Sequence, residues 1–297
     1  MNKERGREVN EGATFYLFIF LPIYLSTLFL LAGCGPNWQF KKAEKLENKK
    51  YYPQAAQIYL RTAEKYPQSQ IAPESLYRAA RIYQKELKIY SKAIEIYSNL
   101  LSSFGKIEQW KTLAEQGIFD SPDYFPLSCA GKKTEGDSET GGSNMRVELS
   151  LEEVSTGVCK ITRKYFAGVR GVASVVRYYK KVNFQLLEST DESFSKPHIR
   201  LKFPFEPGST WESEDGTRKM RLKIEATGLT VKVRAGEYNN CIKVRMEDAA
   251  FAGSYKYEYF APDIGLVLTS VGSQKSAKEH RNSELINISQ HRIFDPR

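Results

Sequence analysis

The sequence predicts an α+β protein of two domains, with helices in the first part of the chain and an antiparallel sheet in the second. Between residues 38 and 105, apolar residues recur at spacings of three and four, the period of an amphipathic helix. From Arg146 onward the period falls to two, as in Val147, Leu149 and Leu151, which is typical of strands with one buried face. We expect this sheet to be a sandwich or a curved half-barrel.

Composition divides the chain further. We assign residues 1–33 to a leader, 34–118 to the helical domain, 119–145 to a linker and 146–290 to the β domain. The linker is predicted because residues 129–145 are rich in Gly, Ser, Thr and charged residues and have no apolar period. Aromatic residues make up 12% of the chain, which argues against long disordered segments.

The leader contains an uncharged apolar run over residues 15–33. This is longer than the usual signal-peptide core and close to the ~20 residues that span a bilayer. The run ends in Leu31-Ala32-Gly33-Cys34, which resembles the lipobox of bacterial lipoproteins. The resemblance implies diacylglycerol on the Cys34 sulfur, cleavage before Cys34, and an anchor in the outer membrane that faces the periplasm, which Gly35 favours. An uncleaved transmembrane helix is the alternative.

The helical domain contains two similar blocks 38 residues apart. Their matching positions are Tyr52 and Tyr90, Ala55 and Ala93, Tyr59 and Tyr97, and Thr62 and Leu100. Each block predicts two antiparallel helices: Ala43 and Leu46 mark the first helix of the first pair, and Leu76, Ala80 and Tyr83 mark that of the second. A further helix over residues 107–116 is expected to cap the array.

The pattern of Ala55, Tyr59, Thr62 and Pro67 resembles the tetratricopeptide repeat. The spacing from Ala80 to Ala93 is one residue longer than that from Ala43 to Ala55, so we expect an inserted residue near residues 86–89. Residues 38–105 are most similar to repeats of the lipoprotein in the outer-membrane β-barrel assembly machinery. The resemblance implies a scaffold that binds a protein partner in the envelope. Tyr59, Tyr83 and Tyr97 are expected in the core.

In the β domain, alternation predicts strands separated by Gly and Pro turns. The segments are residues 200–203, 218–226, 229–234, 241–247, 255–260 and 266–271. Three phrases, at residues 201–211, 233–241 and 259–267, resemble a family of uncharacterised β-rich bacterial envelope domains. We expect Trp211 and Tyr259 to fill the core, and Gly236 and Gly265 to occupy turns.

Few residues suggest a catalytic site or a metal site. His198, His280 and His291 are not at metal-ligand spacing and have no evident nucleophile partner, so we predict no metal, no cofactor and no enzymatic activity. Glu152 and Glu153 are expected at a solvated strand end. Cys159 and Cys241 could form a disulfide, but buried or free thiols, Cys129 included, are equally compatible with the sequence.

The net charge of +9 would attract the protein to anionic lipid headgroups or other anionic envelope polymers, and a solvated basic surface without a partner is the alternative. No recognition motif indicates nucleic acid. The first hypothesis is therefore a lipid-anchored envelope scaffold, with Cys34 as its lipid attachment site and an envelope protein as its partner. The alternative is a periplasmic carrier or sensor that encloses a lipid or other apolar ligand in the β domain. A carrier requires a cavity of several hundred Å³ inside the sheet.

Overall fold

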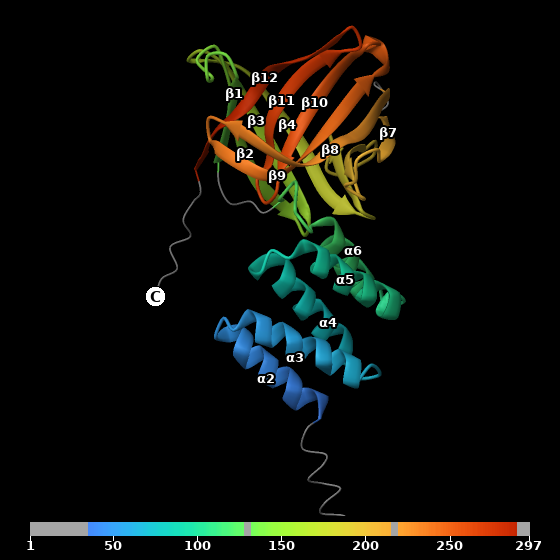
Figure 1. Ribbon diagram of the computed structural model, residues 1–297. Helices are drawn as coiled ribbons and strands as arrows, with labels where there is room; N and C mark the ends of the chain where they lie inside the picture. Colours follow the sequence, from blue (N-terminus) through green and yellow to red (C-terminus); the bar gives the residue numbers. More distant parts are fainter. Residues whose placement is uncertain (1–34, 128–131, 215–218, 290–297) are drawn as a thin grey trace, which may run out of the picture. The chain divides into compact units, whose positions relative to one another are not determined.

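The structure is a computed structural model that describes residues 35–127, 132–214 and 219–289 (Figure 1). The chain divides into two compact units, Met1–Lys88 and Ile89–Arg297. The predicted leader, the lipid attachment site Cys34, and the residues Cys129 and His291 lie outside the described residues. Within the described ranges, no helix combines the length and the apolar character needed to cross a membrane.

The first unit consists of α2 (Pro36–Asn48), α3 (Tyr52–Lys65), α4 (Ala72–Arg81) and the π-helical turn η2 (Ile82–Glu86). Ala43, Ala55 and Tyr59 are completely buried, as predicted, and the two alanines let the helices approach closely. The Tyr59 hydroxyl donates to Glu47 at 2.8 Å, so the buried phenol keeps a polar partner. The helix α3 ends two residues before Pro67, also as predicted.

The π-helical turn η2 explains the irregular spacing of the second block. The amide of Leu87 donates to the carbonyl of Ile82 at 3.0 Å, one residue further along than in an α-helix. Such a turn accommodates one extra residue within a helix. The sequence predicts the insertion near residues 86–89, and the structure has it at residues 82–86, at the end of the first unit.

The second unit begins with α5 (Tyr90–Phe104) and α6 (Glu108–Phe119), both of which the sequence predicts as helices. Tyr97 of α5 packs directly on Gly117 of α6, where an added Cβ would lie 2.4 Å from the ring. These two helices belong to the same unit as the sheet, so the predicted domain boundary at residue 118 is wrong. The helix pairs are present, whereas their membership of the tetratricopeptide family stays a prediction.

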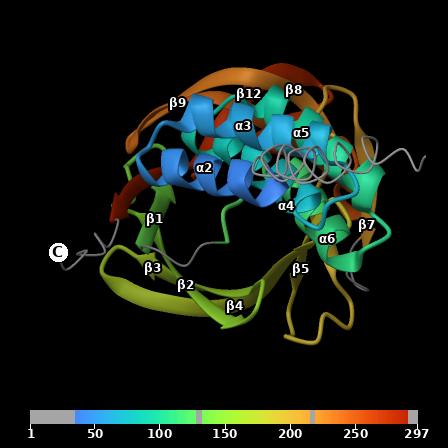
Figure 2. The ribbon, with the colours of Figure 1, turned by 90° about the horizontal axis from the view of Figure 1, so that it is seen from below.

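The rest of the second unit is a twelve-stranded sheet in which every neighbouring pair is antiparallel. Its strands are β1 (Lys132–Asp137), β2 (Met145–Ser155), β3 (Val158–Ala167), β4 (Arg170–Val182), β5 (Gln185–Ser189), β6 (His198–Lys202), β7 (Thr210–Glu214), β8 (Lys219–Val233), β9 (Gly236–Asp248), β10 (Ser254–Ala261), β11 (Gly265–Ser273) and β12 (Ser276–Ser289). The order is β6-β5-β4-β3-β2-β1-β12-β11-β10-β9-β8-β7, and the sheet curves into a nearly closed ring (Figure 2).

The predicted linker 119–145 is wrong. Strand β1 lies within it and pairs with both β2 and β12. Before β1, the buried residues Phe119, Tyr124 and Phe125 join the core of the sheet. The composition suggests a linker here because the sequence of β1, KKTEGD, has no alternation of apolar and polar residues. The inward side chains of β1, Lys133 and Glu135, lie in a polar part of the interior.

One end of the curved sheet is filled by apolar side chains. Phe125 stacks on Tyr179 of β4 with ring centroids 5.0 Å apart, and it also packs against Phe260 of β10. Lys181 of β4 holds this segment through Asp120 and Asp123, at 2.6 and 2.7 Å. The α6 helix and residues 119–127 therefore close one end of the sheet.

Candidate ligand-binding cavity

A cavity of about 1100 Å³ opens at the other end of the sheet. It is lined by residues of strands on both sides of the ring and of two connections, namely β5–β6 and β9–β10. Apolar lining comes from Met220, Met246 and Val271, with Tyr255 and the exposed Phe251 near the rim. The interior is therefore filled at one end and hollow at the other.

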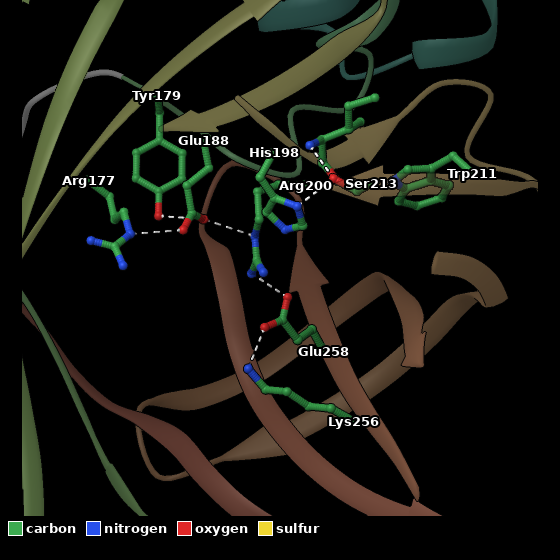
Figure 3. A network of polar contacts seen from close by, with 10 residues as sticks. Arg177, Tyr179, Glu188, His198, Arg200, Trp211, Ser213, Lys256 and Glu258 are labelled. Atoms are coloured by element: carbon green, nitrogen blue, oxygen red, sulfur yellow. Dashed lines mark hydrogen bonds and ion pairs between the residues drawn. The ribbon is translucent and has the colours of Figure 1, made fainter. Parts of the chain in front are cut away.

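An ionic network lies at the base of this cavity (Figure 3). Arg200 of β6 reaches across the interior to Glu258 of β10, with Nη2 2.5 Å from Oε2. Its Nε lies 3.3 Å from Glu188 of β5. Lys256 contacts the other oxygen of Glu258 at 2.8 Å, and the Tyr179 hydroxyl donates to Glu188 at 2.9 Å. Charged side chains thus join β5, β6 and β10 inside the sheet, and the Tyr179 hydroxyl adds β4.

Burial and ion pairing act in opposite directions on Glu258. The side chain is 3% exposed, and burial alone would raise its pKa. Arg200 and Lys256 outweigh burial, so the pKa of Glu258 falls well below its usual value. Burial likewise opposes the charge of Arg200, but the two glutamates raise the pKa of its guanidinium. Glu258 and Arg200 are therefore both charged at neutral pH.

Three further ionisable groups, on β1 and β3, lie close to this network. The Nε of Arg163 on β3 is buried without a hydrogen-bond partner among the described residues. Glu135 of β1 lies near it, and burial raises the pKa of this carboxyl although Arg163 opposes the shift. Burial also lowers the pKa of Lys133. The charged interior therefore extends from the network to β1 and β3, although none of these three residues lines the cavity.

The two edge strands of the sheet, β6 and β7, meet through side chains. Ser213 Oγ of β7 accepts the amide of Ile199 at 2.7 Å, and the Trp211 indole donates to the Ile199 carbonyl at 3.1 Å. Ser213 Oγ also lies 2.5 Å from Nδ1 of His198 (Figure 3). These bonds take the place of a backbone ladder and nearly close the ring.

The histidines and cysteines singled out in the sequence fall into different environments. His198 is buried at the β6–β7 contact, whereas His280 is exposed and lines the cavity. Cys159 and Cys241 are buried and not disulfide-bonded, and burial raises the pKa of the Cys241 thiol to about 11. Among the described residues, no group of His, Cys, Asp or Glu is arranged to hold a metal.

Three structural predictions are confirmed or refined. Trp211 lies in the core, and Glu152 and Glu153 are exposed near a strand end, as expected. Tyr259 is only partly buried, because it lies on the outer face of β10, where its hydroxyl donates to Glu279.

Arg200, Glu188 and Glu258 were not predicted as site residues from the sequence. The sequence contains one signal for Glu258. It lies two residues before Phe260 on β10, so this charged side chain is on the same face of the strand as a core aromatic residue. Its partner Arg200 could not be identified, because it lies 58 residues away in the sequence, on β6.

Comparisons with known proteins give distant matches. No protein-family model and no curated protein matches the chain. Solved structures that resemble it include a putative exported protein with YmcC-like fold from Bacteroides fragilis, at 16% identity and a TM-score of 0.39. Another is a putative lipoprotein from Parabacteroides distasonis, at 12% identity and a TM-score of 0.38. Each match covers 56% of this chain and 98% of the other. Similarity at this level carries no argument about function.

Proposed function

We propose that the curved sheet binds an amphipathic ligand with an anionic group. The cavity carries this proposal, because its volume of about 1100 Å³ lies just above the usual range of ligand pockets, roughly 300–1,000 Å³, and is large enough for a lipid-sized ligand. This is the carrier or sensor function that the sequence left as the alternative. The Met220, Met246 and Val271 side chains would contact the apolar part of the ligand.

The charges that line the cavity favour an anionic ligand. The cationic side chains are Arg177, Lys196, Arg200, Lys256 and Lys278, and the carboxylates are Glu188, Asp191 and Asp248. Asp191 is already engaged by the hydroxyls of Ser189, Ser193 and Ser195. Lys196 and Lys278 are exposed to solvent and do not belong to the ionic network at the base of the cavity, so their ammonium groups can contact a ligand without breaking that network.

Lipid binding tests the proposal directly. The purified full chain is titrated with lysophosphatidylglycerol and with lysophosphatidylcholine, and binding is measured by calorimetry. The variant Val271→Trp fills the cavity, and Val182→Trp, an exposed position on β4, is the matched control. We expect the anionic lipid to bind more tightly and Val271→Trp alone to lose binding. Equal binding by both variants, or none by the parent protein, would refute the proposal.

The proposed ligand site involves no catalytic step. His198 and Ser213 resemble a catalytic pair in their separation, but Ser213 Oγ is occupied by the Ile199 amide, and its residue is 3% exposed. A nucleophile must reach its substrate, and this hydroxyl is buried between two strands. We therefore propose a structural role for this pair, in closing the sheet.

We also propose that the protein is an envelope lipoprotein anchored through Cys34, with a protein partner for its helices. The lipobox resemblance supports the anchor. For the partner, the supporting observation is that Trp38 and Tyr51 in the first unit are each 53% exposed. Cross-linking in the native membrane, with Trp38→Ala and Tyr51→Ala as comparison variants, tests this second function. Recovery of the same proteins with both variants would argue against it.

A further inference from the structure

Two apolar loops project at the open end of the sheet. The first, between β9 and β10, has the uncharged sequence Ala249-Ala250-Phe251-Ala252-Gly253. Its short helix η3 (Ala249–Phe251) buries no residue, and Phe251 is 66% exposed while also lining the cavity. A large aromatic side chain left in water at a loop tip requires an explanation.

The second loop is the tip of the β3–β4 hairpin. Strand β4 pairs with β5 only from Tyr178 to Val182, and the first of these residues lies opposite Ser189 at the cavity. The preceding part of β4 therefore extends past β5 beside the cavity. At the tip, Val169 is 96% exposed and Val172 is 52% exposed. Figure 1 shows this turn and the β9–β10 turn at the same end of the sheet.

The hairpin is also strongly basic. Residues 154–187 contain seven Lys and Arg residues and no Asp or Glu. Of these cations, Lys164 and Arg170 are exposed near the tip. Around the cavity, Lys196, Lys275 and Lys278 are exposed as well. The open end thus combines apolar tips with cations around them.

We propose that this end of the sheet docks onto an anionic lipid bilayer, with Phe251 and Val169 inserted between the headgroups. Apolar side chains that enter the acyl boundary and cations that contact acidic headgroups are the two contributions to interfacial binding. The apolar tips stand on separate loops and form no continuous patch, which suits insertion between lipids better than the buried centre of a protein interface. The inference rests on surface residues and does not require a ligand in the cavity.

Site-specific fluorescence tests this surface in the full chain. Tryptophan is introduced as Phe251→Trp or Val169→Trp, and as Val182→Trp at the other end of β4 for a control, since Val182 is 40% exposed. Each protein is mixed with vesicles of phosphatidylcholine alone or with added phosphatidylglycerol, both containing brominated acyl chains. The parent chain supplies the background from its own tryptophans.

We expect bromine quenching above background for Phe251→Trp and Val169→Trp with the anionic vesicles, and none for Val182→Trp. Adding Arg170→Glu should weaken the vesicle response of the Val169→Trp protein by more than about fivefold, the effect of one cation at an anionic surface. Quenching that is equal at all three positions would mean that another part of the chain binds the vesicles. Quenching at none of them would mean that this end stays in water. Either result overturns the proposal.

Discussion

Replacing Glu258 by Gln should destabilise the sheet of the second unit. Glutamine keeps the volume of the side chain but removes its charge, which now balances Arg200 at 2.5 Å and Lys256 at 2.8 Å. Breaking a buried ion pair typically costs about 3–5 kcal/mol. Lys256 is 47% exposed and can regain water, and Arg200 retains Glu188 at 3.3 Å. We therefore expect the lower end of this range, about 3 kcal/mol.

The effect should depend on pH in a definite direction. Because the folded pKa of Glu258 lies below its unfolded value of about 4.3, the carboxylate contributes its full stability above that pH. This contribution is lost as the pH falls through the folded pKa, where the parent side chain becomes neutral like glutamine. The difference in the free energy of unfolding between parent and variant should therefore shrink in acid.

Urea denaturation followed by the circular dichroism of the strands measures this difference at neutral and acidic pH. The matched control is Glu212→Gln on β7, whose carboxylate is 68% exposed and lies 3.3 Å from the exposed Lys219. It should change the free energy of unfolding by less than about 1 kcal/mol. A loss below 1 kcal/mol for Glu258→Gln at neutral pH, or a loss that is the same in acid, would refute the reasoning.

Three other variants test separate parts of the structure. Lys181→Met should lower the free energy of unfolding by about 3 kcal/mol, because it leaves Asp120 and Asp123 buried without their cation. Its control is Lys160→Met on β3, which removes the ion pair with the exposed Glu152 and should be nearly neutral. Thermal denaturation of both variants measures the difference. Gly117→Ala should lower stability by about 1–3 kcal/mol, since its Cβ would overlap the Tyr97 ring, and Gly171→Ala, with its nearest atom at 3.8 Å, is the control. Cys34→Ala should leave the chain unprocessed in cells, and normal cleavage seen on a gel would show that the lipobox interpretation is wrong.

The helices could be predicted because their signal is local. Ala43, Ala55, Tyr59 and Tyr97 each lie on the apolar face of their own helix, and all four are buried. The π-helical turn was also detectable in the sequence, because the spacing from Ala80 to Ala93 is one residue longer than in the first block. The sequence could not show where one unit ends and the next begins, because that depends on which helices pack together, as Tyr97 does with Gly117.

The strands were harder to predict, because this sheet encloses charge. Alternation of apolar and polar residues identifies a strand only where the buried side chains are apolar. Strand β2 satisfies this through Val147, Leu149 and Leu151, and it was predicted. The interior side chains of β1 are Lys133 and Glu135, so its sequence predicts a linker and not a strand. Segments 218–226 and 229–234 were predicted as two strands, but β8 is continuous through irregular pairing with β9.

The position of the ionic network bears on what the interior is for. Glu258 and Phe260 are neighbours on the same face of β10, and they mark the change from the charged base of the cavity to the apolar core. Buried ion pairs seldom stabilise a fold more than apolar residues of the same volume. Folding alone would therefore be served as well by continuing the core past Phe260. Arg200, Glu188 and Glu258 lie instead where the apolar filling stops and the cavity begins. Their cost to stability is better explained if this end of the interior recognises the polar group of a ligand.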